Sequence, residues 1–285
     1  VQTGIRIAKD GESTHLGERG LQPPDGWGDW PCLHLCAEWP TCAIVPRRNC
    51  MPSPAVDDLH AWLGLLGAKG IGRRTAALLL GHFGGPCEVM AAGPVAWSQV
   101  VDPSRCRALS EAMQMAQDPL RRCLSWLNSD PRHHIVTLAC PDYPQALLHS
   151  PDPPLMLYAA GSLTAWQAPL VAMVGSRQAT PLGLATARRL GAAISAAGVG
   201  VVSGMALGID AAAHEGALSG GGPTIGVLGC GIDLVYPRRH HGLADQMIGS
   251  GLLVSEYSLG APAIRDHFPQ RNRIIAGLSV ATVVV

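Results

Sequence analysis

The sequence predicts an α/β fold: a Rossmann-like, doubly wound and mostly parallel sheet, preceded by a small all-α region. Beyond about residue 130, short apolar segments rich in β-branched residues alternate with helical patterns. Such alternation is typical of parallel strands joined by crossover helices. The strand-like segments are also continuously apolar, as expected where both faces of a sheet are covered. Residues 56–128 show helical spacing, which predicts that the all-α region comes first.

The bulk composition limits the classes to which the protein can belong. The chain has 285 residues, 47% of them hydrophobic, and 21 basic side chains against 21 acidic ones. Because nucleic-acid binders often carry a basic excess, such a function would need a local basic patch here. No apolar run reaches the roughly 18 residues of a membrane helix. Nine cysteines without a CxxC pair indicate reduced thiols of a cytoplasmic protein rather than a disulfide framework.

Composition and periodicity divide the chain into three predicted regions. An irregular N-terminal extension covers residues 1–52, and a helical domain of the SAM or helix-hairpin-helix kind covers 53–129. A Rossmann-like domain covers 130–285. Asp130-Pro131 marks the second boundary because proline interrupts a helical pattern.

The N-terminal extension follows neither the helical nor the strand period, although it holds three tryptophans and four cysteines. Helical character starts soon after Met51, so we expect translation to begin there and the extension to be non-native. The alternative is a zinc knuckle on four closely spaced ligands: Cys32, His34, Cys36 and Cys42. Their spacing matches no common zinc pattern, so no metal and no other cofactor is predicted.

One turn in the helical region has the features of a nucleic-acid contact. Gly70-Ile71-Gly72 allows a tight turn with positive φ, and a new helix is expected directly behind it. The free N–H groups of that helix can face a phosphate, with charge from Lys69, Arg73 and Arg74. This pattern resembles a helix-hairpin-helix element. A plain helical turn with surface arginines explains the same residues equally well.

The remaining elements follow from apolar runs and the residues that interrupt them. Helices are expected near residues 103–117, 118–128, 181–197, 209–219 and 240–249. Strands are expected at residues 134–138, 155–158, 170–174, 199–202, 224–228, 252–254 and 279–285.

The helix expected at 181–197 has clear signals at both ends. Thr180 is a suitable N-cap, Pro181 a suitable first helical residue, and Gly198 suits the C-terminal cap. Five apolar residues form its expected buried stripe: Leu182, Leu190, Ala193, Ile194 and Ala197.

Ligands of doubly wound sheets bind at the carboxyl ends of the strands, and three predicted strand ends carry distinctive loops. Gly175-Ser176-Arg177 follows the strand at 170–174, just before the helix that opens near Thr180. Bare backbone, a hydroxyl, a guanidinium and a helix N-terminus together are typical of a phosphate cradle. Ser203-Gly204 follows the next strand, and Gly229-Cys230-Gly231 follows the one after.

A second basic cluster precedes the last predicted strand. Arg271 and Arg273 bracket Asn272, and Phe268 lies one turn earlier. The arginines are predicted to clamp phosphates and the phenyl ring to stack on a base. The alternative is a capped helix whose arginines are tied to carboxylates inside the fold, which we expect for one of the two.

The sequence lacks the signatures of enzymatic nucleotide chemistry. It contains neither the dinucleotide-binding GxGxxG pattern after a strand nor a Walker lysine. Ser203, Asp210 and His214 permit a Ser/His/Asp interpretation, but no G-x-S-x-G elbow supports it. We expect instead that Asp210 caps a helix or turn and that His214 packs behind it. A structural ion pair explains Glu256 equally well, so no catalytic residue is predicted.

Five blocks of the sequence together resemble the DNA-processing protein A family, also called Smf. They are residues 174–177, 203–214, 229–237, 255–257 and 268–279. The resemblance covers about residues 56–285. It implies a cytoplasmic recombination mediator, not an enzyme, that binds and protects single-stranded DNA during natural transformation and loads the RecA recombinase. It also implies a homodimer.

The resemblance places a DNA pocket on nine residues of this chain: Gly175, Ser176, Arg177, Ser203, Gly204, Phe268, Arg271, Asn272 and Arg273. Some family members have a further basic residue just upstream of the Phe-Pro pair. Arg265 is the candidate here, although Asp266 follows it. Family members continue past Val285, so we expect this chain to be truncated at its C-terminus, and to fold poorly, to dimerise weakly or not to engage RecA.

Two other functions remain open at this point. A nucleotide-processing enzyme of the phosphoribohydrolase type carries a Gly-Gly-x-Gly-Thr phosphate loop, whose nearest match is residues 220–224. That string precedes a predicted strand instead of following one, which argues against the enzyme. A purely structural partner protein would leave the clustered arginines unexplained.

Overall fold

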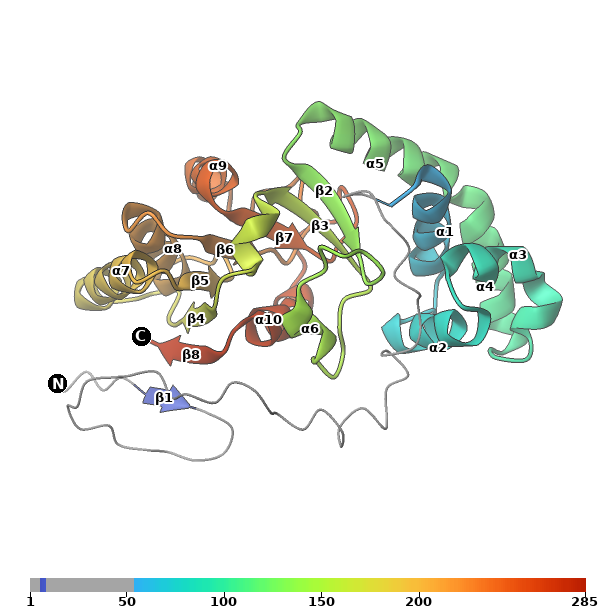
Figure 1. Ribbon diagram of the computed structural model, residues 1–285, viewed down its shortest axis with the longest axis horizontal. Coiled ribbons are helices and arrows are strands. Elements are labelled where there is room, and N and C mark those ends of the chain that lie inside the picture. Colours follow the sequence, from blue (N-terminus) through green and yellow to red (C-terminus); the bar gives the residue numbers. More distant parts are fainter. Residues whose placement is uncertain (1–5, 9–53) are drawn as a thin grey trace.

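The computed structural model describes residues 6–8 and 54–285, so the zinc alternative falls outside the described residues. Its centre is a sheet with the strand order β1-β8-β4-β5-β6-β7-β3-β2 (Figure 1). The strands are β1 Arg6–Ala8, β2 His133–Thr137, β3 Met156–Gly161, β4 Leu170–Val174, β5 Gly200–Ser203, β6 Thr224–Val227, β7 Leu252–Ser255 and β8 Ala281–Val284.

The central strands β8, β4, β5, β6 and β7 run parallel, which confirms the predicted mostly parallel α/β sheet. Its two edges depart from that pattern, because β3 is antiparallel to β7, β2 to β3, and β1 to β8. The helix between β2 and β3, α6 (Gln145–Leu148), has only four residues. A parallel connection normally needs a full crossover helix, so β2 and β3 pair antiparallel instead.

Helices cover both faces of the sheet, as a doubly wound fold requires (Figure 1). Met173 and Val201 pack under α7 (Pro181–Ala196) and α8 (Ile209–Ser219). Their chain neighbours Ala172 and Val202 face the opposite way, toward α6 and α10 (His267–Leu278). This alternation follows from the two-residue period of a strand. The helix α9 (His241–Ser250) packs against β3, β6 and β7.

The contact between α7 and α8 differs from the predicted apolar stripe. Leu182 is 64% exposed, and the buried positions of α7 are Ala187, Gly191 and Ser195. Small residues bring the two helices close together, since a Cβ on Gly216 of α8 would overlap the backbone of α7. A stripe of leucines would have held the helices further apart. The N-cap signal is confirmed, because the Thr180 hydroxyl accepts a hydrogen bond from the Gly183 N–H at 3.1 Å. At the other end the C-cap is Ala197, and Gly198 follows it with a φ of 79°.

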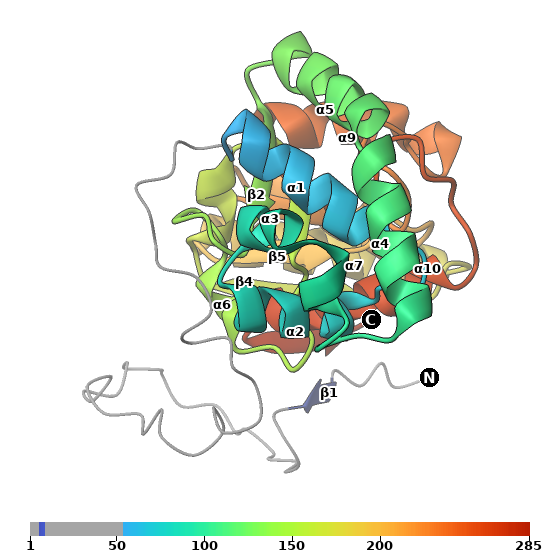
Figure 2. The same ribbon diagram turned by 90° about the vertical axis from the view of Figure 1, so that its right-hand side faces the viewer.

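The helical region lies between β1 and β2 in the chain, and its helices face the viewer at one end of the sheet in Figure 2. It comprises α1 Val56–Gly67, α2 Arg73–Phe83, α3 Pro86–Trp97, α4 Pro103–Met115 and α5 Gln117–Ser129. The new helix expected behind the glycine turn is α2, and Gly70 has the positive φ of 80°. Gly72 is extended, so the turn uses only one of its two glycines in that way.

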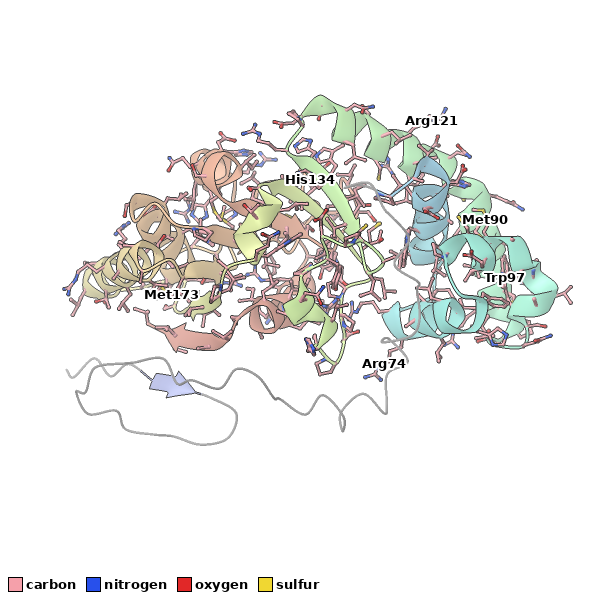
Figure 3. All side chains as sticks on the ribbon, viewed as in Figure 1. Arg74, Met90, Trp97, Arg121, His134 and Met173 are labelled. Atoms are coloured by element: carbon pink, nitrogen blue, oxygen red, sulfur yellow. The ribbon has the colours of Figure 1, made fainter. Side chains whose placement is uncertain are left out.

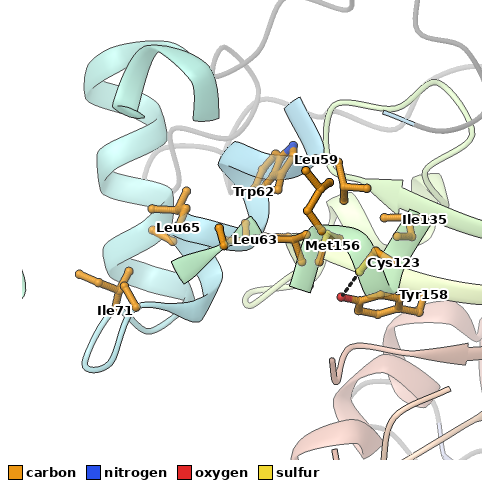
Figure 4. Packing of buried hydrophobic residues seen from close by; sticks show 14 of the residues in the cluster. Leu59, Trp62, Leu63, Leu65, Ile71, Cys123, Ile135, Met156 and Tyr158 are labelled. Carbon is orange, nitrogen blue, oxygen red and sulfur yellow. Dashed lines mark hydrogen bonds between the residues drawn. The ribbon is translucent and has the colours of Figure 1, made fainter. Parts of the chain in front are cut away.

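One hydrophobic cluster joins the helical region to the sheet. Leu59 and Leu63 of α1 belong to the same cluster as Ile135, Met156 and Tyr158 of β2 and β3 (Figure 4). The Tyr158 hydroxyl also lies 3.7 Å from the Cys123 sulfur of α5. Because this core is continuous, the helical region packs directly on the sheet. The domain boundaries near 53 and 130 stay a prediction.

In the described part of the chain, no helix is both long and apolar enough to span a membrane. Within the same residues, no cluster of three or more His, Cys, Asp or Glu side chains is arranged to hold a metal ion. The cysteines of this part are free thiols: Cys87, Cys106, Cys123, Cys140 and Cys230.

Candidate nucleic-acid interface

A pocket of about 320 Å³ lies at the carboxyl ends of β4 and β5. The end of β4 contributes Val174, Gly175 and Arg177, and the segment after β5 contributes Ala206 and Asp210. The rest of the lining comes from α10 and the loop before it: Arg265, Phe268, Pro269, Arg271, Asn272 and Ile275. Six of the predicted site residues therefore meet here, in a lining with three arginines and one carboxylate.

Arg177 presents its charge at the surface of the pocket. Its side chain is exposed, its guanidinium carbon lies 5.5 Å from the centre of the Phe268 ring, and within residues 54–285 no carboxylate pairs with it. The loop beneath it is ordered, since the Ser176 hydroxyl accepts a hydrogen bond from the Gln178 N–H at 3.1 Å. The arginine therefore has a defined position and an unpaired charge.

Phe268 lies at the centre of a group of flat side chains. The guanidinium of Arg271 lies 5.9 Å from its ring centre, in addition to that of Arg177. The ring of Tyr236, whose side chain is 53% exposed, lies 5.7 Å from it. Phe268 is in the first turn of α10, where the N–H groups of His267 and Phe268 donate to the carbonyls of Ile264 and Arg265. The arrangement offers an aromatic surface beside the arginines of the pocket lining.

Arg271 forms part of the pocket wall and is not a mobile clamp. It is only 3% exposed, and its guanidinium donates hydrogen bonds to the carbonyls of Gly204 and Val227. Its Nε also donates to Oδ1 of Asn272 at 2.9 Å. Gly204 has no side chain, and a Cβ there would overlap the guanidinium. Burial lowers the pKa of Arg271, but an arginine stays charged at neutral pH.

Asp210 balances part of this charge from the floor of the pocket. It accepts hydrogen bonds from the N–H groups of Gly204 at 3.1 Å and Ala206 at 3.3 Å, as expected of a turn cap. Burial raises the pKa of Asp210, and the nearby charge of Arg271 opposes that shift. The carboxylate therefore holds the turn after β5 and partly neutralises Arg271.

Ser203 and His214 each bond away from the pocket. The Ser203 hydroxyl donates to the carbonyl of Met173 at 2.6 Å. The fully buried His214 has its Nδ1 2.7 Å from the Thr224 hydroxyl, and burial lowers its pKa to about 3. This confirms that His214 packs behind Asp210. It also shows that Ser203, Asp210 and His214 do not form a catalytic relay.

The structure does not bring Arg273 into the pocket. Its guanidinium forms ion pairs with Glu256 and, at 3.3 Å, with Asp152. Arg73 of the helical region joins the same group, 2.6 Å from Asp152 and 3.6 Å from Glu256. Arg73, Asp152, Glu256 and Arg273, here called the junction cluster, tie α2 to the sheet region. Arg273 thus follows the alternative of an arginine tied to carboxylates.

The junction cluster perturbs one of its own carboxyl groups. Burial alone would raise the pKa of Asp152, but the hydrogen bond from Arg73 and the charges of Arg73 and Arg273 lower it below its ordinary value. The carboxyl is therefore ionised at neutral pH and holds both arginines.

The other basic residues of the helical turn remain at the surface. Lys69 and Arg74 are exposed, and Arg74 projects away from α2 (Figure 3). Arg73 is part of the junction cluster, so only two of the three predicted secondary contacts are open to a ligand.

Sequence reasoning assigned no site role to Asp210 and Tyr236, which both border the pocket region. Asp210 was expected to be a structural cap, and its position near the charge of Arg271 could not be read from sequence spacing. Tyr236 lies in the block after β6. The signal that could have found it is its position after a strand end, where ligand-binding loops of such sheets gather.

Comparison with known proteins now places the chain in a family. A family model described as "DNA recombination-mediator protein A" matches residues 134–285, more than half of the chain. This chain belongs to the DNA recombination-mediator protein A family. The match includes every residue of the pocket.

Individual relatives agree with that family. The chain is 45% identical over 149 residues to Protein Smf of Synechocystis, covering 51% of this chain and 37% of that protein. It is 31% identical over 210 residues to the DNA processing protein DprA of Bacillus subtilis, covering 73% of this chain and 70% of that protein. The X-ray structure of DprA from Streptococcus pneumoniae matches with a TM-score of 0.61 at 28% identity, covering 80% of this chain and 76% of that one.

The chain spans less than half the length of several curated relatives. It covers 37% of the Synechocystis protein and 48% of Protein Smf from Escherichia coli, to which it is 37% identical over 180 residues.

Proposed function

We propose that this chain binds single-stranded DNA in the pocket between β4, β5 and α10, without chemically changing it. The observation that carries the proposal is the exposed, unpaired Arg177 held against Phe268 at the strand ends. A single strand offers phosphates for the guanidinium and unstacked bases for the ring. Duplex DNA keeps its bases stacked and cannot use the ring in this way.

The remaining predicted residues take more limited parts in this proposal. Gly175 and Ser176 supply the backbone turn that positions Arg177, and Arg265 adds an exposed charge at the rim. Gly204, Arg271 and Asn272 shape the wall through their hydrogen bonds. Ser203 and Arg273 support the fold rather than the ligand. Lys69 and Arg74 offer a separate, secondary contact.

We further propose, from the family membership, that DNA held in this way is protected and passed to the RecA recombinase in the cytoplasm during natural transformation. Family relatives are named DNA processing proteins, which supports a role in handling DNA. Dimerisation belongs to the same proposal. Sedimentation of the chain alone and with purified RecA tests both associations.

The phosphoribohydrolase alternative receives no support from the geometry. The glycine string 220–222 lies just before β6, at the amino end of the sheet. The pocket lies at the opposite, carboxyl edge, so the string cannot cradle a phosphate there.

The pocket is tested by measuring the affinity of the 285-residue chain for a labelled oligothymidylate and for a matched duplex. We expect Arg177→Ala to weaken single-strand binding by about 1–3 kcal/mol, the value of a charge-assisted contact. Arg189→Ala is the matched control, because Arg189 is also exposed and lies further along α7. Equal binding by the two variants, or equal affinity for single strand and duplex, contradicts the proposal.

A further inference from the structure

The segment after β6 continues beside the pocket, although none of its residues belongs to the pocket lining. It runs from Tyr236 through the short helix η3 (Arg238–His240). At its start, the half-exposed Tyr236 ring lies 5.7 Å from the centre of Phe268, tilted by 43° to it. An aromatic side chain so placed extends the flat surface of the pocket outward.

The other end of the segment is hydrogen-bonded to the loop after β5. His240 Nδ1 lies 3.0 Å from the carbonyl of Met205, and the next residue, Ala206, lines the pocket. The segment is therefore held at both ends against the pocket wall. Arg238 and Arg239 lie between these two attachments, so their position beside the pocket is set by the fold.

The charges of Arg238 and Arg239 are not neutralised. Both side chains are exposed, and neither pairs with a carboxylate anywhere in the part of the chain that the structure describes. The acidic residue of the same loop, Asp233, accepts hydrogen bonds from the Gly260 N–H at 2.9 Å. Arginines that support a fold here have partners, as Arg188 has in Glu215 at 2.7 Å.

We propose that Tyr236, Arg238 and Arg239, together called the exit strip, bind the next nucleotides of a strand that leaves the pocket. The proposal rests on the proposed function, because the pocket must hold the same strand. The Tyr236 ring stacks on a base, and the two guanidinium groups contact phosphates. An exposed ring followed by unpaired guanidinium groups matches the alternating base and phosphate of a flexible single strand.

The test compares two lengths of oligothymidylate on the full chain. One has about 4 nucleotides and the other about 16, the two ends of the range for single-strand binding folds. We expect Arg238→Ala/Arg239→Ala to weaken binding of the longer strand about tenfold and to leave the shorter one within about twofold. For the longer strand, the slope of the logarithm of the binding constant against the logarithm of salt concentration should become shallower by about 1.4. This corresponds to about 0.7 for each of the two lost phosphate contacts.

Tyr236 is tested by a pair of variants that separates stacking from its hydroxyl. Tyr236→Ala should weaken the longer complex about fivefold or more, the effect of one lost base–ring contact. Tyr236→Phe should retain it, because a phenyl ring stacks equally well. A loss in both variants would overturn the stacking role.

A matched control is Arg121→Ala/Arg122→Ala, which removes two adjacent exposed arginines from α5. It should leave both affinities unchanged. The exit strip is overturned if its double variant behaves like this control on the longer strand, or if it weakens both lengths equally. Failure of the proposed function gives a different result: Arg177→Ala would then bind both oligonucleotides with normal affinity.

Discussion

Arginine plays two different parts in the pocket, and only the surroundings distinguish them. Arg271 is buried and satisfies two backbone carbonyls, so it belongs to the framework of the wall. Arg177 is exposed beside Phe268 and keeps its charge for a ligand. Burying a charge is costly unless its hydrogen bonds are satisfied, which is why the carbonyls of Gly204 and Val227 surround Arg271.

His214 shows the same dependence on surroundings in its protonation state. The Thr224 hydroxyl donates to the Val201 carbonyl at 3.0 Å, so it accepts the hydrogen bond from Nδ1 of His214. This assigns the ring proton to Nδ1. Within the described residues, Nε2 has no hydrogen-bond partner. The folded protein therefore holds the neutral ring.

This neutral ring predicts a pH dependence of stability. The folded pKa of His214 is about 3, whereas an unfolded histidine titrates near 6.5, so the unfolded chain binds the proton first. We expect this contribution to be complete above about pH 6.5 and to fall by about 1.4 kcal/mol per pH unit below it. Urea unfolding between about pH 7 and 5 measures the slope. The free energy of unfolding of His214→Gln should depend less steeply on pH. Parallel plots of this free energy against pH for the two proteins would contradict the assignment.

At the scale of the element, α10 serves two sites at once. Arg271 and Arg273 are two positions apart, so their side chains leave the helix about 200° apart. Arg271 reaches the pocket wall, and Arg273 reaches the junction cluster. From the sequence, a capped helix was only one alternative for this segment, and without a definite helix the opposite directions of the two arginines could not be predicted.

Elements with strong local signals were predictable almost to the residue. β4 (Leu170–Val174) and α8 (Ile209–Ser219) have the predicted bounds, because an apolar run and flanking glycines mark them. Leu182 was wrong as a core residue, since the contact between α7 and α8 depends on how closely the two backbones approach. The exit strip was missed for a similar reason: its arginines are ordinary surface residues until Phe268 and Met205 are placed beside them.

The close crossing of α7 and α8 predicts a sharp cost for one added methyl group. Gly216→Ala puts a Cβ into the Arg188 carbonyl of α7, so we expect a loss of about 1–3 kcal/mol in the free energy of unfolding. Gly249→Ala in α9 is the control, because nothing lies within 4 Å of its added Cβ. Alanine favours helix there, so the control should be neutral or more stable by up to about 1 kcal/mol. Equal midpoints of chemical denaturation for Gly216→Ala and Gly249→Ala would contradict this close packing.

At the scale of the whole molecule, the helical region is attached to the sheet in two ways. The shared core around Tyr158 supplies apolar contact, and the junction cluster adds partly buried ion pairs. The predicted helix-hairpin-helix turn thus contributes one of its arginines to the protein's own interior contacts. The family resemblance could indicate the two regions, but not the contacts between them.

The junction cluster can be tested by removing one charge. Asp152→Asn leaves Arg73 and Arg273 to share Glu256 alone, and we expect a loss of about 1–3 kcal/mol in stability, between the values for exposed and buried pairs. Asp118→Asn is the control, because its pair with Arg121 is 76% exposed on both sides. That change should cost less than about 1 kcal/mol. Thermal unfolding of both variants measures these losses of stability. Equal losses in Asp152→Asn and Asp118→Asn would show that the cluster does not stabilise the junction.

The fixed position of Arg271 has a consequence for binding thermodynamics. Its guanidinium is already bonded to two carbonyls before any ligand arrives, so its side-chain freedom is lost during folding and not during association. Ordering a long side chain at an interface otherwise costs about 0.5–1.5 kcal/mol. The wall of the pocket is in this sense preorganised. The entropic cost of capture falls instead on the incoming flexible strand, which becomes ordered only when it binds.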